Sequence, residues 1–303
     1  LEVETAHRSL RLAPKADRDP DPLPPYCAFF GFRSEPFAAG GVFWGRQHQR
    51  ALAELARGIR LRSGVAVLTG RAGTGKTTLL LRLAERLVRE SIEFGLILNP
   101  GAGSLDFYES LARDLYLSWT RRSREEVLQS LAEFLHDQAR RGSTTALLID
   151  NAQDLDREVL EDLRLLDELR DRRGRLAQVV LCGTPDLNGR LGSGDSGWSA
   201  HPLAMHLHLR PLAQGETARY IADRMAEAGV DSSSVFPPGV VAEIHRLSGG
   251  ILHRIDTVCN RLLARCFSFG ATTATVDLLE GTDSEPDRPQ PAPSLVRSLG
   301  RTG

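Results

Sequence analysis

The chain has 303 residues, of which 41% are hydrophobic and 25% are charged, and its formal net charge is −1. This composition is ordinary for a globular protein, and the length suits one large domain or two smaller ones. A nearly neutral chain lacks the bulk basicity of many nucleic-acid-binding proteins, although its many Arg residues leave room for local basic patches. No apolar run approaches the ~18 residues that a membrane-spanning helix needs.

The four cysteines form no Cys-x-x-Cys pair, and two of them lie in apolar segments, as small core residues would. The first residue is Leu rather than Met, as in a chain cropped at its N-terminus, and the start shows no basic-then-apolar signal pattern. We therefore expect a protein of a reducing, cytoplasmic compartment, without a disulfide framework.

Both ends of the chain are poor in apolar residues. Residues 1–25 are rich in Pro, Asp and Arg, and residues 281–303 in Gly, Ser, Pro and charge, so we expect two disordered tails. Residues 26–60 instead open with aromatic rings and continue into a helix from 47 to 60. The rings either fix this segment across the domain or form a lid over a planar ligand, and the sequence leaves both interpretations open. These rings belong to Tyr26, Phe29, Phe30, Phe32, Phe37, Phe43 and Trp44.

Residues 61–210 predict an α/β domain, and residues 211–280 a small helical one. In the first, continuous apolar runs alternate with helical patterns, which predicts a parallel sheet covered by helices on both faces. The expected strands are 65–68, 94–98, 145–150 and 178–182, and the expected helices are 76–90, 105–117, one that opens at a capping box of Ser123 and Glu126, and 155–169. The second domain shows three helical patterns, at 216–228, 238–247 and 251–267.

A glycine loop between the first strand and its helix fits G-x-x-x-x-G-K-[ST] at every fixed position. Glycines let backbone N–H groups turn inward around phosphate oxygens, and the following helix directs the positive end of its dipole at the same anion. We expect Lys76 to reach the β- and γ-phosphates of ATP, and the Thr77 hydroxyl to hold Mg²⁺. The residues expected to bind the nucleotide here are Gly70, Arg71, Ala72, Gly73, Thr74, Gly75, Lys76, Thr77 and Thr78.

The strand at 145–150 ends in Asp150, which can hold Mg²⁺ through water beside Thr77. The next position is where a hydrolase normally places a Glu that polarises the attacking water, and here it is Asn151. An amide orients water but accepts no proton at neutral pH, so the hydrolytic step is in question. After the next strand, Thr184 is placed either to contact the γ-phosphate or simply to form a turn with Pro185.

With these residues the chain resembles, from about Tyr26 to Phe267, the AAA+ ATPases of the general secretion pathway A (ExeA/GspA) type. That group is itself similar to the TnsC and TniB transposition ATPases. The resemblance rests on residues 29–37, 70–77, 99–100, 150–155 and 183–187, and in the helical domain on Leu212, Glu216-Thr217, Tyr220-Ile221 and 248–251. It implies a P-loop NTPase (AAA+) fold with a helical lid, ATP and Mg²⁺ as cofactors, and a homo-oligomer formed through the nucleotide interface.

The chain departs from the family pattern at three places. Asn151 stands in place of Glu, and His253 takes the lid position whose Arg reaches the γ-phosphate, with Arg254 one residue, about 100° of helix, away. Residues 192–202, where the family supplies an arginine finger to its neighbour, contain no Arg. We count Asn151, Thr184, His253 and Arg254 as the candidate catalytic residues.

The adenine is expected between the aromatic segment, from Phe37 to Arg46, and the lid at 251–254. The favoured interpretation is an ATP–Mg²⁺-binding switch with slow or lost hydrolysis, which acts with an unidentified protein of a secretion or pilus assembly. It would lie in the bacterial cytoplasm, or at the inner membrane through that partner. Two alternatives remain: a competent secretion ATPase motor, and a DNA-binding transposition regulator. The second needs a basic stripe, for which Arg121-Arg122 with Arg124, Arg140-Arg141 and Arg170 to Arg175 are candidates.

Overall fold

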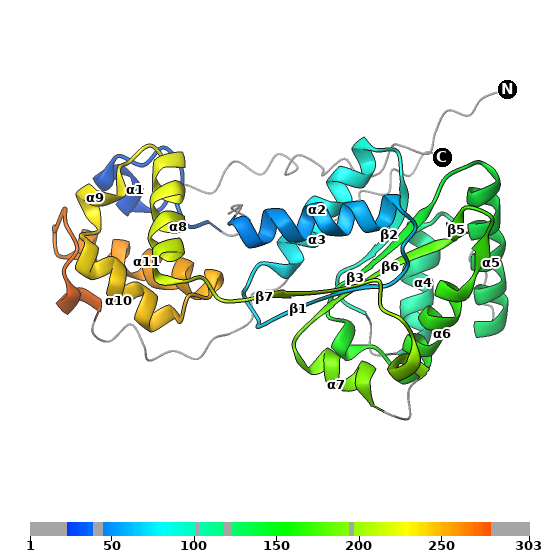
Figure 1. Cartoon of the computed structure of the whole chain (residues 1–303). Helices are drawn as coiled ribbons and strands as arrows, with labels where there is room; N and C mark the ends of the chain where they lie inside the picture. Colours follow the sequence, from blue (N-terminus) through cyan, green and yellow to red (C-terminus); the bar gives the residue numbers. More distant parts are fainter. Residues whose placement is uncertain (1–22, 39–44, 101–102, 118–122, 194–196, 280–303) are drawn as a thin grey trace, which may run out of the picture. The chain divides into compact units, whose positions relative to one another are not determined.

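A computed structural model describes residues 23–38, 45–100, 103–117, 123–193 and 197–279. The chain divides into two compact units (Figure 1). Trp44–Arg210 form one, the sheet unit, and Leu1–Phe43 together with Pro211–Gly303 form the other, the helical unit. Both tails expected from the sequence lie almost wholly outside the described residues.

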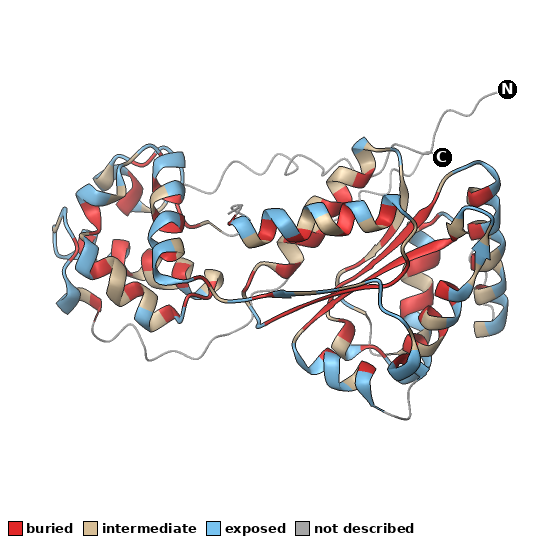
Figure 2. Cartoon of the chain, in the orientation of Figure 1, coloured by how far each residue is buried: buried red, intermediate tan, exposed pale blue. Residues whose placement is uncertain are grey.

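The sheet unit is organised around five parallel strands in the order β2-β3-β6-β1-β7. Every residue of β1, β3 and β6 is buried, as their colour in Figure 2 shows. Strands with both faces covered must be apolar throughout, which explains the continuous apolar runs in the sequence. The bounds are β1 Ala66–Gly70, β2 Glu93–Ile97, β3 Thr145–Ile149, β6 Ala177–Gly183 and β7 Met205–Leu209.

Helices cover both faces of the sheet, as predicted. On one face, α2 and α3 pack on Leu68, Leu148 and Val180. On the other face, α4, α5, α6, α7 and η2 pack around Leu147 and Leu181. Their bounds are α2 Arg46–Arg60, α3 Lys76–Arg89, α4 Ser104–Asp114, α5 Arg124–Arg140, α6 Arg157–Glu168, α7 Asp186–Gly192 and η2 Gly197–Ala200.

The helical unit has a core of its own. The three helices predicted for it are present, as α8, α10 and α11. The described part of this unit comprises α1 Pro25–Phe30, α8 Gln214–Glu227, α9 Ser232–Val235, α10 Pro238–Ser248, α11 Leu252–Ser268 and η3 Val276–Leu279. They enclose one apolar cluster that includes Tyr220, Ile244, Ile255 and Leu262.

The aromatic segment belongs to this helical core. Tyr26, Phe32 and Phe37 are 6%, 5% and 2% exposed, and they pack into the same cluster. Hydrogen bonds fix the segment as well: Asn260 Nδ2 donates to the Phe37 carbonyl at 3.1 Å, and Arg224 Nη2 to the Ala38 carbonyl at 2.9 Å. The rings therefore fix the segment by packing. Phe43 and Trp44 lie outside the described residues.

The domain boundary predicted near the start of the chain differs from the division into two units in the structure. The prediction treats 26–60 as one segment, whereas the aromatic part packs in the helical unit and helix α2 in the sheet unit. The strand β7 was not predicted. It lies at the edge of the sheet, and its sequence Met-His-Leu-His-Leu lacks the continuous apolar run of the strands covered on both faces. The short helices α1 and α7, and the hairpin of β4 Arg170–Asp171 and β5 Gly174–Arg175, were also missed.

Two smaller expectations are confirmed. Ser123 and Glu126 form the predicted capping box at the start of α5. All four cysteines are buried free thiols. Within the described residues, the helices are all too short or too polar to cross a membrane.

Candidate nucleotide site

The glycine loop joins the end of β1 at Gly70 to the start of α3 at Lys76. Gly73 and Gly75 have φ angles of +77° and +90°, a region that residues with a Cβ rarely adopt. Gly75 is a fixed position of the motif, and its conformation explains why the motif needs glycine there. The 14-residue helix α3 starts directly after the loop, so its N-terminal N–H groups and dipole favour an anion at this place.

Lys76 lies under the loop rather than on the surface. Its side chain is buried, and Nζ donates to the carbonyls of Gly70 at 2.9 Å and Arg71 at 3.1 Å. Burial lowers the pKa of this ammonium group, while the nearby Asp150 acts in the opposite direction. A cation held against two carbonyl oxygens beside the loop is available to a phosphate that displaces those contacts.

Thr77 and Asp150 meet as the metal-site prediction expects. The Thr77 hydroxyl donates to Asp150 Oδ2, and Asp150 is 1% exposed. A hydroxyl and a carboxylate that share one position are oxygen donors of the kind Mg²⁺ takes when phosphates supply its other ligands. Among the described residues, no group of three or more His, Cys, Asp or Glu could hold a metal ion on its own. The donor set therefore fits a Mg²⁺ ion that arrives with its nucleotide.

Asn151 follows Asp150 in the left-handed conformation, with φ +51°, which Asn tolerates better than most residues. Its Nδ2 donates to the Leu98 carbonyl and to Asn99 Oδ1, both at 3.1 Å. Because both partners, which follow β2, are oxygen acceptors, they fix the orientation of the Asn151 amide with its nitrogen toward them. The amide therefore has its carbonyl oxygen left for a water, and this oxygen accepts hydrogen bonds but takes no proton.

Thr184 lies at the end of β6, between the strand that leads to Asp150 and the strand that leads to the loop. Its hydroxyl donates to Asp186 Oδ2 at 3.1 Å, and its backbone N–H donates to Gln153 Oε1 at 3.0 Å. The same carboxyl edge of the sheet thus carries the loop, Asp150, Asn151 and Thr184.

Two residues at the site were missed by the sequence reasoning. His48 on α2 is 3% exposed, and its Nε2 lies 2.9 Å from the Thr74 carbonyl in the loop. Cys182 on β6 is buried beside Asp150 and Lys76, and burial raises the pKa of its thiol, so it is neutral. No sequence motif marks either residue, because each reaches the site from an element distant in the chain.

The remaining candidates fall on different units. Arg46 is the exposed first residue of α2 in the sheet unit. Phe37, His253 and Arg254 belong to the helical unit, where Phe37 is a core residue and Arg254 is exposed. Their roles toward adenine and the γ-phosphate stay predictions.

The order of the strands defines the class of protein. The loop strand β1 lies between β6 and β7, and the Asp150 strand β3 is its second neighbour, separated from it by β6. This five-stranded parallel sheet with a P-loop, and a helical unit after it, is the fold of the AAA+ P-loop NTPases. Residues 59–191 match the family model described as an AAA domain.

The relatives agree with this class. The chain is similar to "General secretion pathway protein A" of Aeromonas hydrophila, at 33% identity over 251 residues, which is 81% of this chain and 46% of that protein. The chain thus spans about half the length of that relative. The fold is also similar to Cdc6p from Pyrobaculum aerophilum, with a TM-score of 0.64 and 23% identity, covering 79% of this chain and 67% of the other. The Aeropyrum pernix ORC2 protein, solved as ADPNP-ADP complexes, gives a TM-score of 0.62 and 18% identity, covering 84% and 72%.

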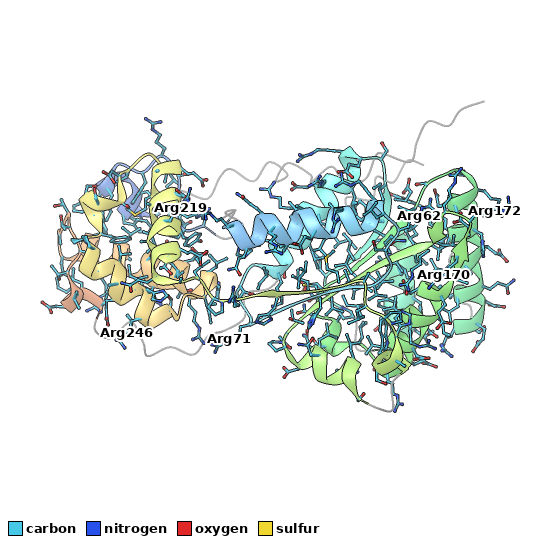
Figure 3. The ribbon with its side chains drawn as sticks, viewed as in Figure 1. Arg62, Arg71, Arg170, Arg172, Arg219 and Arg246 are labelled. Atoms are coloured by element: carbon cyan, nitrogen blue, oxygen red, sulfur yellow. The ribbon has the colours of Figure 1, made fainter. Side chains whose placement is uncertain are left out.

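Two described members of the predicted basic stripe, Arg124 and Arg175, are engaged within the fold. Arg124 bonds Asp162 through Nε at 2.8 Å and lies 3.1 Å from Glu158, and the buried Arg175 pairs with Asp167. Figure 3 shows Arg170 and Arg172 near Arg62, at the opposite end of the sheet unit from Arg71. Arg62 itself lies 3.6 Å from Asp171. These contacts favour structural roles for Arg124 and Arg175, and Arg121-Arg122 lie outside the described residues.

Proposed function

We propose that this chain is an ATP–Mg²⁺-binding AAA+ module with slow hydrolysis, which acts as a nucleotide-dependent switch in a bacterial secretion or pilus assembly. The proposal rests mainly on the Asn151 amide, which follows Asp150, the residue expected to bind Mg²⁺ together with Thr77. The similarity to a general secretion pathway protein supports the setting.

Slow turnover follows from the chemistry of the amide. A general base that takes a proton from the attacking water contributes about 10²–10⁴-fold to a rate. Asn151 supplies only a carbonyl oxygen, because its nitrogen bonds Leu98 and Asn99. Water is positioned but not deprotonated.

A missing arginine adds to this effect. Residues 192–202 contain no Arg, and an arginine finger contributes about 10³–10⁵-fold in related phosphoryl transfers. A protein that binds ATP and keeps it for long times suits a switch, because the bound nucleotide then sets which surface is presented to a partner.

Partners and location follow from the same proposal. A homo-oligomer through the nucleotide interface, and a protein partner in the cytoplasm or at the inner membrane, are the expected interactions. The competing function is a fast ATPase motor, in which Asn151 or a neighbour places the water well enough for rapid turnover.

The test measures ATP affinity and turnover together, in the wild type and in Asn151→Glu and Asn151→Asp. Both substitutions add a carboxylate, and Asp tolerates the positive φ of this position better than Glu does. We expect a wild-type rate well below the ordinary ~1 s⁻¹. At least one variant should turn over faster, by less than the full ~10² of a general base, because the arginine is still missing.

Lys76→Ala is the control, and it should abolish nucleotide binding in a folded protein. Unchanged ATP affinity in this variant would remove the phosphate-loop assignment. Wild-type turnover near 1 s⁻¹ or above would favour the motor. If ATP binds and both carboxylate variants turn over as slowly as the wild type, Asn151 is not the main defect.

A further inference from the structure

Gln153 connects two parts of the sheet unit that are distant in sequence. It lies in the turn η1 Ala152–Asp154, two residues after Asn151. Its Oε1 accepts from the Thr184 N–H at 3.0 Å, and its Nε2 donates to Asp154 Oδ2 at 2.9 Å. Because an N–H only donates and an ionised carboxylate only accepts, the two partners fix which way the amide faces.

Gly183, at the end of the neighbouring strand β6, leaves space for the Gln153 side chain. A Cβ on Gly183 would lie 2.6 Å from Gln153 Oε1, a distance that real Cβ atoms essentially never show. Any residue other than glycine at 183 would therefore push the Gln153 amide away from Thr184. The close approach holds the end of β6 directly against the turn that follows Asp150.

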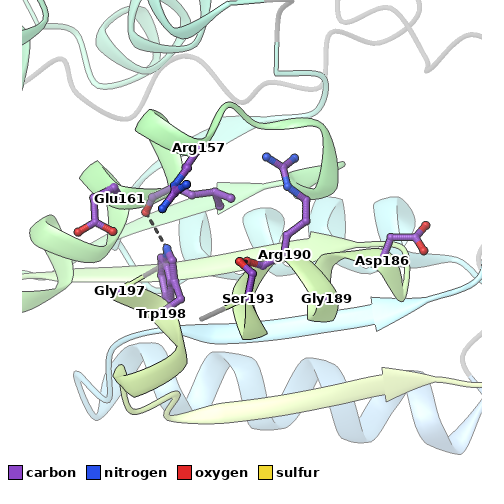
Figure 4. Close-up of a pocket in the computed structure, with 9 residues that line it drawn as sticks. Arg157, Glu161, Asp186, Gly189, Arg190, Ser193, Gly197 and Trp198 are labelled. Carbon is purple, nitrogen blue, oxygen red and sulfur yellow. Dashed lines mark hydrogen bonds between the residues drawn. The ribbon is translucent and has the colours of Figure 1, made fainter. Parts of the chain in front are cut away.

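The backbone of Gln153 leads to a second element. Arg190 Nη1, on α7, donates to the Gln153 carbonyl. Arg190 and Trp198 line one hollow of about 520 Å³ beside α6 and α7, and Figure 4 shows both side chains there. The Trp198 ring is 3% exposed, and its Nε1 donates to the Leu160 carbonyl at 2.9 Å. The Gln153 side chain thus bonds Thr184 at the end of β6, and the Gln153 carbonyl accepts a hydrogen bond from Arg190 on α7.

We propose that Gln153 is a positioning residue that holds Thr184 for the γ-phosphate and transmits the state of that site to α7 through Arg190. This inference rests on the proposed function, because it needs ATP at the phosphate loop. It gives the switch a physical connection from the bound nucleotide to a surface hollow lined by residues of α6 and α7.

The first test compares affinities for ADP and for the β,γ-imido analogue of ATP. Gln153→Met removes both hydrogen-bonding groups at similar size, whereas Gln153→Glu keeps an acceptor for the Thr184 N–H. We expect Gln153→Met to lower the preference for the ATP analogue about 3–10-fold, as the loss of one or two hydrogen bonds does, with ADP affinity unchanged. Gln153→Glu, which keeps the acceptor but loses the donor to Asp154, should retain more of that preference than Gln153→Met. A purely structural role would lower both affinities alike.

The second test follows Trp198 fluorescence in the 303-residue chain with Trp44→Phe and Trp119→Phe. We expect the ATP analogue, but not ADP, to change the emission. Arg190→Met should abolish this response, and Arg190→Lys, which still donates a hydrogen bond, should restore part of it.

The outcomes separate the two proposals. Failure of the wild type to bind either nucleotide refutes the proposed function itself. Equal wild-type affinities for ADP and the analogue, or an unchanged preference in folded Gln153→Met, overturn the role of Gln153. A Trp198 response that persists in Arg190→Met overturns the route through α7, and this holds even if the Gln153 variants prove unstable.

Discussion

Asp256 on α11 shows how a single buried carboxylate shapes the helical unit. The Tyr220 hydroxyl donates to its Oδ1, and the positive charge of Arg224 lies nearby. Loss of water around the carboxylate outweighs both of these interactions and raises its pKa from 3.8 to about 7. The group is therefore partly protonated near neutral pH in the folded protein, although it is ionised in the unfolded chain.

This pKa predicts a pH-dependent stability. The folded state binds the Asp256 proton more tightly than the unfolded state, so the contribution is complete below pH 3.8 and is lost as pH rises to about 7. Between pH 5 and pH 8 this loss amounts to at most about 3 kcal/mol, because only the part of the window above pH 5 is crossed, and Asp256→Asn should remove it. Urea unfolding at pH 5 and pH 8 measures it, as the change in the free energy of unfolding between the two pH values.

The exposed Asp223 on α8 gives the matched control. Asp223→Asn should leave the difference between pH 5 and pH 8 as it is in the wild type. If Asp256→Asn and the wild type lose the same stability between these pH values, Asp256 does not titrate in this range.

At the scale of elements, the end of α10 depends on two adjacent glycines that differ in their surroundings. Gly249 and Gly250 have φ angles of +59° and +71°. A Cβ on Gly249 would meet nothing within 4 Å, whereas one on Gly250 would lie 2.1 Å from the Leu212 carbonyl oxygen. The Leu212 N–H in turn donates to the Gly250 carbonyl at 2.8 Å, which ties the start of the α8 segment to this turn.

The pair predicts unequal costs for the same substitution. Gly249→Ala should lower the free energy of unfolding by about 1–2 kcal/mol, the cost of a left-handed residue with a Cβ. Gly250→Ala should cost clearly more, because backbone atoms must also move. Thermal or urea unfolding of the two variants checks this, and equal losses would contradict the close approach to Leu212.

The elements also show what the sequence predicts and what it does not. β1, β3 and β6 were predictable because strands covered on both faces are apolar at every position, and the loop with Asp150 because its chemistry fixes its residues. The edge strand β7, with its alternating His residues, carries no such signal. At the site, His48 and the bonds of Gln153 depend on contacts between distant segments, which local patterns do not encode.

In the sequence, the sheet unit is an insertion between the two segments of the helical unit. The chain begins in the helical unit, forms the sheet unit from Trp44 to Arg210, and then returns. The sheet unit has two apolar clusters of its own, one on each face of the sheet. The helical core, by contrast, needs Tyr26, Phe32 and Phe37 from the first part of the chain.

Fragments should therefore behave differently. Residues 44–210 expressed alone are expected to unfold cooperatively, whereas residues 211–279 alone are expected to fold poorly, because three core aromatic rings are missing. A synthetic peptide of residues 23–38 should raise the helicity of the second fragment. Circular dichroism and urea titration measure all three, and a fully folded 211–279 fragment would contradict the shared core.

The discontinuity has a consequence for synthesis. The ribosome synthesises Tyr26, Phe32 and Phe37 long before it synthesises α8, α10 and α11, which cover them. At synthesis speeds of about 5–20 residues per second, these rings wait on the order of ten seconds or more for their partners. During that time the sheet unit is able to fold, while the nascent chain exposes an apolar segment whose core partners are not yet made. A chain that stops prematurely near Arg210 would keep this segment exposed permanently, and it would be a substrate for aggregation or proteolysis.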